Sequence, residues 1–300
     1  MRVVTDSPAS FRKIGEQIRT VSQSIADLKF DTRNVIYVGS LFTLTSEMFM
    51  ARRLVCYIDV PRIQDNFKSI WNSIKHKAIL VTNSKYCADL IERYYGVMVH
   101  DIVPHGVDPR YYNEKLMNNY KLFHVLNMSQ TYREGIDIYS AVIAELHLRN
   151  MNVVTCHVTR DRAVGADHVF ELRQYIPDWL FAQLYAMSRS YLVTSRHEGF
   201  CMHVIEAGAI GCIPIVPNIE PYIEHKVPFK VTYNATLDID KLWSNPDGKY
   251  PVVEFNIDDI VKAIEIALKQ EVKQYEVEYV RDQYDIFRLY RKLLEYVSVR

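Results

Sequence analysis

The segment Ser195-Arg-His-Glu-Gly-Phe-Cys-Met-His-Val-Ile-Glu-Ala-Gly-Ala-Ile-Gly-Cys-Ile-Pro214 decides the fold of this chain. An apolar run, Tyr191 to Thr194, precedes it, and a second run, Ile213 to Val216, ends it. Between them, a glycine-containing turn leads into a helix predicted over His203 to Ile210. Three of the ten glycines of the chain lie between residues 199 and 211, where backbone geometry is therefore expected to matter most. This order predicts a parallel β-α-β unit.

Short apolar strands and amphipathic helices alternate on both sides of this segment. Strands are predicted at 3–4, 35–38, 54–58, 78–81, 97–103, 123–128, 153–156, 169–172, 191–194 and 213–216. Helices are predicted at 11–28, 84–95, 136–148, from 178, at 203–210, at 257–268 and at 276–297. The polar stretch 108–119 is interpreted as a linker. We therefore predict an α/β protein with two doubly wound domains, 1–110 and 115–275, that face a crevice.

Composition excludes several classes of protein. The 300 residues contain 36 Lys and Arg and 36 Asp and Glu, so the formal net charge is zero, which disfavours a general nucleic-acid binder. No run of about 18 apolar residues and no signal peptide is present, although weak peripheral membrane association stays open. Five scattered cysteines without a Cys-x-x-Cys pair favour free thiols in a reducing cytoplasm over disulfides or a structural zinc site.

Two common nucleotide-binding motifs are missing. No Gly-x-Gly-x-x-Gly follows a predicted strand, which disfavours a dinucleotide-dependent dehydrogenase. No Gly-x-x-x-x-Gly-Lys-Ser/Thr occurs either, which disfavours the usual nucleotide triphosphatases.

The turn and helix in 195–214 predict a site for a phosphorylated sugar. Free backbone N–H groups near Cys201 to His203, together with the helix dipole, suit a diphosphate. Glu198 lies just before the turn, where its carboxylate can accept hydrogen bonds from a polyol. Glu206 lies farther along the helix and suits a second pair of hydroxyls, such as those of a ribose. A diphosphate between two hydroxyl-binding carboxylates describes a nucleotide sugar.

At these residues the chain resembles the retaining GT-B glycosyltransferases (glycosyltransferase family 4-like), whose signature is Glu, seven residues, Glu. Here the signature is Glu198-Gly-Phe-x-x-x-x-x-Glu206, followed by Ala and a Gly-x-Pro turn. Three further stretches agree in order and spacing: 82–108, 127–137 and 178–195. The resemblance implies two Rossmann-like domains, with the N-terminal one binding acceptor and the C-terminal one binding the donor. It also implies that the last helix, within 276–300, crosses back to the N-terminal domain.

The resemblance also implies a role for each signature residue. Glu206 would hold the ribose, and Glu198 would contact the transferred sugar as a catalytic residue. The backbone of four residues would face the sugar and the distal phosphate: Gly199, Phe200, Cys201 and Met202. Ser129 and Gln130 would lie in the donor-binding loop, and Tyr175 beside the base. The leaving diphosphate would help to deprotonate the acceptor, so neither a metal nor another cofactor is implied.

The chain departs from the family in the loop that neutralises the diphosphate. Gln130 stands near the usual Arg and Glu134 at the usual Lys. Arg133 is adjacent and is the candidate that supplies the missing charge as a second catalytic residue. A poorly neutralised diphosphate is a poorer leaving group, which predicts slow turnover. In addition, Cys201 replaces a usual Gly, and the first loop, 7–10, lacks glycine.

Simpler interpretations of several residues stand beside the functional ones. His105 and Asp108 are expected to cap a turn, and His197, His203, Cys201 and Cys212 to be packing or surface residues. For the whole chain, one alternative is a non-catalytic nucleotide-sugar or glycan-binding protein, and another is a hydrolase or epimerase that acts on nucleotide sugars. A nucleic-acid-glucosylating enzyme is disfavoured, because residues 1–115 contain 16 basic and 12 acidic side chains, a surplus of only 4.

Overall fold

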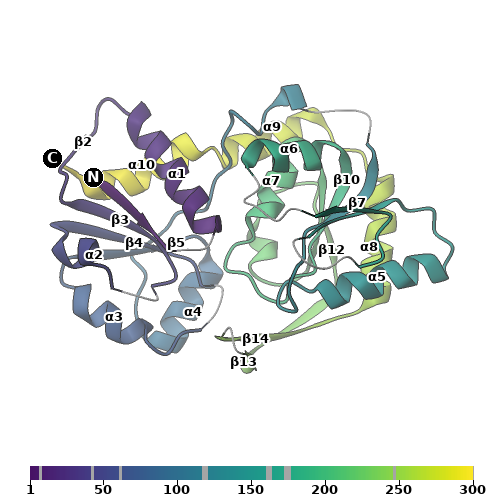
Figure 1. Ribbon diagram of the computed structural model, residues 1–300, viewed down its shortest axis with the longest axis horizontal. Coiled ribbons are helices and arrows are strands. Elements are labelled where there is room, and N and C mark those ends of the chain that lie inside the picture. Colours follow the sequence, from purple (N-terminus) through teal and green to yellow (C-terminus); the bar gives the residue numbers. More distant parts are fainter. Residues whose placement is uncertain are drawn as a thin grey trace.

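The computed structural model describes residues 1–6, 9–41, 44–60, 63–116, 121–159, 164–171, 177–245 and 248–299. Two separate parallel sheets lie side by side, each with helices on both faces (Figure 1). None of the helices formed by these residues is both long enough and apolar enough to cross a membrane. All five cysteines are buried and unpaired.

The first sheet has the strand order β1-β3-β4-β5-β6, and every neighbouring pair is parallel. Alternate residues of β3 face opposite layers: Val35 and Tyr37 join the core under α2 to α4, whereas Ile36 and Val38 join the core under α1 and α10. The strands are β1 (Arg2–Thr5), β3 (Asn34–Gly39), β4 (Arg53–Ile58), β5 (Ala78–Thr82) and β6 (Asp101–Ile102). The helices are α1 (Ala9–Ser24), α2 (Ser46–Met50), α3 (Phe67–Ile74) and α4 (Lys85–Tyr95).

The second sheet has the order β12-β11-β10-β7-β8-β9 and is also parallel. Helices α6 and α7 pack together beside β10, and α5 packs against α8. The strands are β7 (Phe123–Asn127), β8 (Thr155–Thr159), β9 (His168–Glu171), β10 (Ser188–Leu192), β11 (Ile213–Pro217) and β12 (Val231–Tyr233). The helices are α5 (Ile136–Leu148), α6 (Asp178–Ala186), α7 (Met202–Ile210) and α8 (Ile257–Lys269), with short 3-10 helices at Glu114–Leu116 and Tyr222–Glu224.

The C-terminal segment differs from the single helix predicted over 276–297, and that prediction was wrong. The chain forms α9 (Gln274–Gln283) and then α10 (Ile286–Val297). Tyr284 is the C-cap of the first helix, and Asp285 caps the second by accepting a hydrogen bond from Phe287 N at 2.7 Å. At the same point Val107 N donates to Tyr284 O at 2.7 Å. The break lets α9 pack on α7 while α10 returns to α1, β3 and β4 of the first sheet, which confirms the predicted return (Figure 1).

An antiparallel hairpin, β13 (Ala235–Asn245) and β14 (Gly248–Phe255), was not predicted. It extends from the second half toward the first (Figure 1). Tyr94 Oη donates to Ile239 O at 2.6 Å, and Leu237 and Leu242 pack against the core of the first half. The alternation of Leu237 and Ile239 with acidic residues was the available sequence signal.

Three further details differ from the sequence analysis. The strand predicted over 97–103 is shortened to β6. The stretch 108–119 begins with packed rather than exposed residues, since Asp108 and Tyr112 are both buried. A two-stranded ribbon, β2 (Lys29–Phe30) with β15 (Ser298–Val299), joins the C-terminal end to the first half.

Gly208 lies where α7 packs tightly against its neighbours. A Cβ atom at this position would lie 3.1 Å from Val227 Cγ1 and 3.3 Å from Val280 Cγ1. We expect Gly208→Leu to lower the free energy of unfolding by about 3 kcal/mol or more, because three further carbons must displace both valines. Gly208→Ala, which needs only small shifts, serves as the matched control. Thermal melts followed by circular dichroism measure both, and equal melting temperatures for Gly208→Leu and wild type would contradict the packing argument.

Candidate functional site

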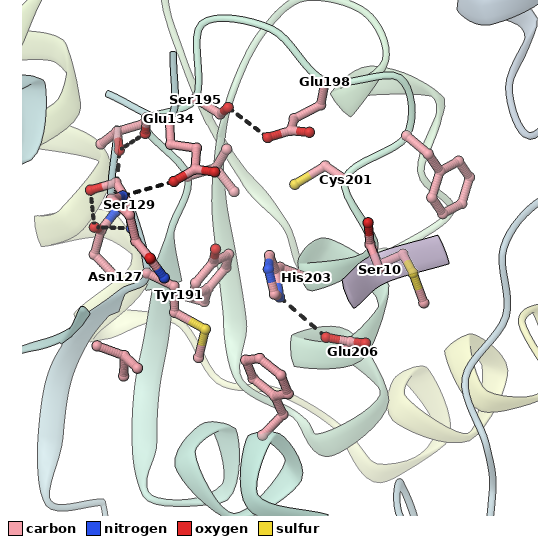
Figure 2. A pocket seen from close by; sticks show the side chains of 18 of the residues that line it. Ser10, Asn127, Ser129, Glu134, Tyr191, Ser195, Glu198, Cys201, His203 and Glu206 are labelled. Atoms are coloured by element: carbon pink, nitrogen blue, oxygen red, sulfur yellow. Dashed lines mark hydrogen bonds and ion pairs between the residues drawn. The ribbon is translucent and has the colours of Figure 1, made fainter. Parts of the chain in front are cut away.

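A cavity of about 450 Å³ lies between the two halves of the molecule. Its wall combines the carboxyl ends of β7 and β10 and the first turn of α7 with Ser10 and Lys13 of α1 and with Asp59, which follows β4. Figure 2 shows Ser10, Ser129, Glu198 and Glu206 around one space, to which they come from several elements. This is the place where doubly wound α/β folds bind ligands, because the strands end there and the helices begin.

The structure gathers most of the predicted site residues around this cavity. Eight of them line it: Ser129, Gln130, Arg133, Glu198, Phe200, Cys201, Met202 and Glu206. Gly199 is not part of the wall, although it belongs to the same turn. Tyr175 lies outside the described residues.

The turn before α7 has an unusual backbone at Cys201. Its φ of 64° and ψ of 76° lie in the left-handed region, which glycine enters without strain and other residues rarely do. This explains why glycine is usual at the position in the family that the chain resembles. Within the described part of the chain no side chain caps α7, so the first turn has backbone N–H groups available at the cavity wall.

Gly199 joins the turn to the first half of the molecule. A Cβ atom here would lie 1.6 Å from Asp59 Oδ1 and 2.9 Å from Cys87 Sγ. Ser84 Oγ donates to Gly199 O at 2.7 Å. Any side chain at 199 would therefore separate the two halves at this point.

Glu198 lies in the wall near the start of the turn. Its Oε1 accepts a hydrogen bond from Ser195 Oγ at 2.7 Å (Figure 2). The same oxygen lies 3.0 Å from Arg133 Nη1. The side chain is 23% exposed, so the carboxylate still has access to a ligand in the cavity.

Arg133 and Glu134 occupy the loop that departs from the family. Arg133 Nη1 donates to His197 O at 2.7 Å, and Nη2 lies 3.2 Å from Glu134 Oε1. Glu134 Oε2 accepts from Gln130 N at 2.8 Å (Figure 2). Glu134 thus orders the loop by capping a backbone N–H, whereas a lysine at this position would offer a positive charge instead.

Glu206 is almost completely buried on α7. Lys13 Nζ donates to its Oε1, and Tyr185 Oη lies 3.3 Å from its Oε2. His203 Nδ1 lies 3.2 Å from the same Oε2 (Figure 2). Burial opposes ionisation, but the nearby Lys13 ammonium overcomes it and holds the pKa of Glu206 well below its ordinary value. Glu206 is therefore a carboxylate at neutral pH, and its partners are all donors.

Lys13 is a site residue that the sequence analysis missed. Its Nζ also lies 2.8 Å from Asp178 Oδ1, at the start of α6. Burial lowers the pKa of Lys13, but the two carboxylates reverse this effect and raise the pKa above its ordinary value. No local signal marks this lysine, because its partners are 165 and 193 residues away in the sequence.

Asp59 is the second site residue that the sequence analysis missed, although the sequence contained a signal for it. It directly follows β4, and polar residues at the carboxyl ends of parallel strands meet at one edge of the sheet. Cys87 Sγ lies 3.6 Å from its Oδ1. Desolvation raises the pKa of Asp59 from 3.8 to about 6.

His105 lies in the same cavity wall. Its Nε2 lies 2.9 Å from Asn83 Nδ2. Burial lowers the pKa of His105 to about 3, so this imidazole is neutral.

The raised pKa of Asp59 predicts a pH-dependent stability. The folded chain binds this proton more tightly than the unfolded chain does, so the stabilisation is complete below the ordinary pKa and is lost as the pH rises through about 6. We therefore expect Asp59→Asn to raise the free energy of unfolding by about 2 kcal/mol near neutral pH and to change it little near pH 4. Urea unfolding at the two pH values measures this. If Asp59→Asn changed the free energy of unfolding equally at both pH values, the predicted pH dependence would be contradicted.

Comparison with solved structures places this architecture among known folds. No family model matches the sequence, and no curated protein matches it. A glycosyltransferase from Rickettsia africae is similar at a TM-score of 0.60 and 16% identity, over 94% of this chain and 80% of that one. The trehalose-6-phosphate synthase OtsA matches at 0.60 and 11%, over 93% and 75%. The pneumococcal O-GlcNAc transferase GtfA matches at 0.60 and 12%, over 95% of this chain and 60% of its own length.

The chain has the GT-B fold. Its two parallel sheets, the cavity between them and the return of α10 to the first sheet are the features that the resemblance led us to expect. At 11–16% identity these neighbours establish the fold alone. The activity of this GT-B chain has to be argued from its own cavity.

Proposed function

We propose that this chain is a retaining glycosyltransferase that moves a sugar from a nucleotide-diphosphate sugar to an acceptor. One observation carries the proposal: Glu198 and Glu206 line one cavity with the uncapped N-terminus of α7 between them. Two hydroxyl-binding carboxylates on either side of an anion-binding helix terminus match the parts of such a donor in order. In support, the neighbour GtfA was solved in complex with UDP and GlcNAc.

The donor would lie along the second half of the molecule. Glu206 would accept hydrogen bonds from the ribose, the N–H groups of Met202 and its neighbours would hold the diphosphate, and Glu198 would orient the transferred sugar. Arg133, 3.0 Å from Glu198, would add positive charge as the bond to the diphosphate breaks. Ser129 and Gln130 would contact the donor from the loop after β7.

The acceptor would enter from the first half, where Ser10, Asp59 and His105 line the cavity. In the proposed reaction the departing diphosphate takes the acceptor proton on the face where it leaves, so the configuration is retained. The reaction as proposed uses no metal. We place it in the cytoplasm because the five cysteines are free thiols, and we propose no nucleic-acid acceptor.

Glu134 also favours a second candidate, a non-catalytic nucleotide-sugar or glycan-binding protein. Its carboxylate takes the position of a phosphate-neutralising lysine and is engaged with Gln130 N and Arg133. Without that positive charge the diphosphate is a poorer leaving group, so a chain with this loop can bind a donor and turn it over slowly or not at all.

A thermal-shift screen with nucleoside diphosphates and nucleotide sugars tests the proposal. A ligand at 100 times its dissociation constant adds about 2.7 kcal/mol to the stability of the folded state. We expect one base to raise the melting temperature and Glu206→Gln to abolish that rise. Release of the nucleoside diphosphate is then followed over time. Binding without release supports the binding protein, release of free sugar without acceptor supports a hydrolase, and no shift with any compound overturns the proposal.

A further inference from the structure

The described charges around the cavity are unbalanced for a ligand that contains a diphosphate. Among the described residues that line it, two are cations and four are carboxylates: Lys13, Arg133, Asp59, Glu134, Glu198 and Glu206. Counted as full charges, these six sum to two negative charges. A diphosphate would add about two more, so a cation of this wall that turned toward the phosphates would favour the binding of such a ligand.

Each of the two cations is already held by a pair of carboxylates. Arg133 is held by Glu134 and Glu198, and its Nη1 also donates to a backbone carbonyl. Lys13 is held by Glu206 and Asp178. A guanidinium fixed by three acceptors has little freedom, whereas an ammonium on a four-carbon stem can move to a new partner.

The partner of Lys13 is the carboxylate that a ribose would occupy. Glu206 already receives Lys13 on Oε1 and lies beside His203 and Tyr185 at Oε2. With these donors in place the Glu206 side chain is only 2% exposed, so we expect ribose hydroxyls to reach Oε1 when the ammonium moves aside. The displaced ammonium would keep Asp178 and would face the same cavity, where the phosphates are the available anions.

We infer that Lys13 is a phosphate-binding residue of the donor site and that it exchanges Glu206 for the diphosphate when a nucleotide binds; this inference rests on the proposed function. The first half of the molecule thereby supplies the positive charge that Glu134 withholds. Because Lys13 lies on α1 and Glu206 on α7, the exchange also couples nucleotide binding to the contact between the two halves.

The test compares two classes of ligand, nucleoside diphosphates and nucleosides, in four proteins. Wild type, Lys13→Met, Asp178→Asn and the double variant are titrated with uridine, guanosine and adenosine diphosphates by calorimetry, and with the three nucleosides by ligand-observed NMR. The double variant is the decisive control, since it removes one positive and one negative charge and leaves the local net charge as in wild type. It also avoids the pair of unneutralised buried carboxylates that could unfold Lys13→Met.

We expect Lys13→Met and the double variant to bind the diphosphate at least about tenfold more weakly, with nucleoside affinity equal or higher because Glu206 is released. Asp178→Asn should bind both ligands at least as well as wild type. Recovery of diphosphate affinity in the double variant, or an equal loss for diphosphate and nucleoside, overturns the inference and leaves the proposed function standing. A wild-type protein that binds none of the three diphosphates overturns the proposed function itself.

Discussion

The Glu198→Gln variant is expected to turn over its nucleotide sugar about 100-fold more slowly than wild type, or worse, while it folds normally. The carboxylate faces the cavity from the turn before α7, and a charged acceptor binds hydroxyls roughly twice as strongly as a neutral one. In the proposed reaction it would also place negative charge beside the sugar, where positive charge develops as the bond to the diphosphate breaks. Folding should persist because the amide oxygen can still accept from Ser195, and Arg133 keeps its bond to His197 O.

Steady-state kinetics with the donor found in the screen measure this effect. The loss should appear in kcat, whereas affinity for the nucleoside diphosphate should hold or improve, because Arg133 is freed from one carboxylate. Glu145→Gln is the matched control, since this carboxylate lies on α5 and pairs with Arg149 away from the cavity. A Glu198→Gln enzyme within about threefold of wild type would show that the carboxylate does not act on the transferred sugar.

Gly135→Ala should cost about 3 kcal/mol or more of unfolding free energy, the largest stability effect of a single methyl group that we expect in this chain. Gly135 begins α5 with a φ of +75°, and an added Cβ would lie 2.0 Å from Thr194 O. The obstacle is the backbone of Thr194, two residues beyond β10, so no rotamer change relieves it. The loop would have to move away from the strand that leads into the signature.

The loss of stability in Gly135→Ala has two causes, the positive φ and the steric clash, and Gly96→Ala separates them. Gly96 ends α4 with a φ of +63°, and nothing lies within 4 Å of its added Cβ. We expect this variant to lose only the cost of a left-handed alanine, about 1 kcal/mol. Urea unfolding measures both variants, and equal losses would contradict the steric argument.

The displacement at residue 135 should also weaken nucleotide binding. Arg196 N donates to Arg133 O at 2.8 Å, and Thr194 Oγ1 donates to Glu134 O at 3.0 Å. These bonds hold the loop that contains Arg133 against the signature strand. Folded Gly135→Ala protein should therefore show a smaller thermal shift with the nucleoside diphosphate than wild type does.

The signature segment was readable from sequence because its determinants are local. A strand, a turn and a helix follow from apolar periodicity and from glycines within some twenty residues. The position of Glu206 relative to the start of α7 follows from helix geometry, and Glu198 lies in the turn just before that helix. The prediction of a single helix over 276–297 failed for the opposite reason, because its determinants are not all local. A hydrogen bond from Val107 N to Tyr284 O and the cap at Asp285 divide one amphipathic pattern into two helices.

By itself, the sequence determined the two series of strands and helices and the turn before α7, because hydrophobic periodicity and backbone hydrogen bonding act between near neighbours. Only the tertiary structure decided which charges meet in the cavity. Lys13 reaches Glu206 across 193 residues, and Asp59 lies against Gly199. Electrostatic interaction depends on separation in space and on burial, and no pattern along the chain records either quantity. Only the tertiary structure therefore shows that the two cations among the described residues of the cavity wall, Lys13 and Arg133, are already paired with carboxylates.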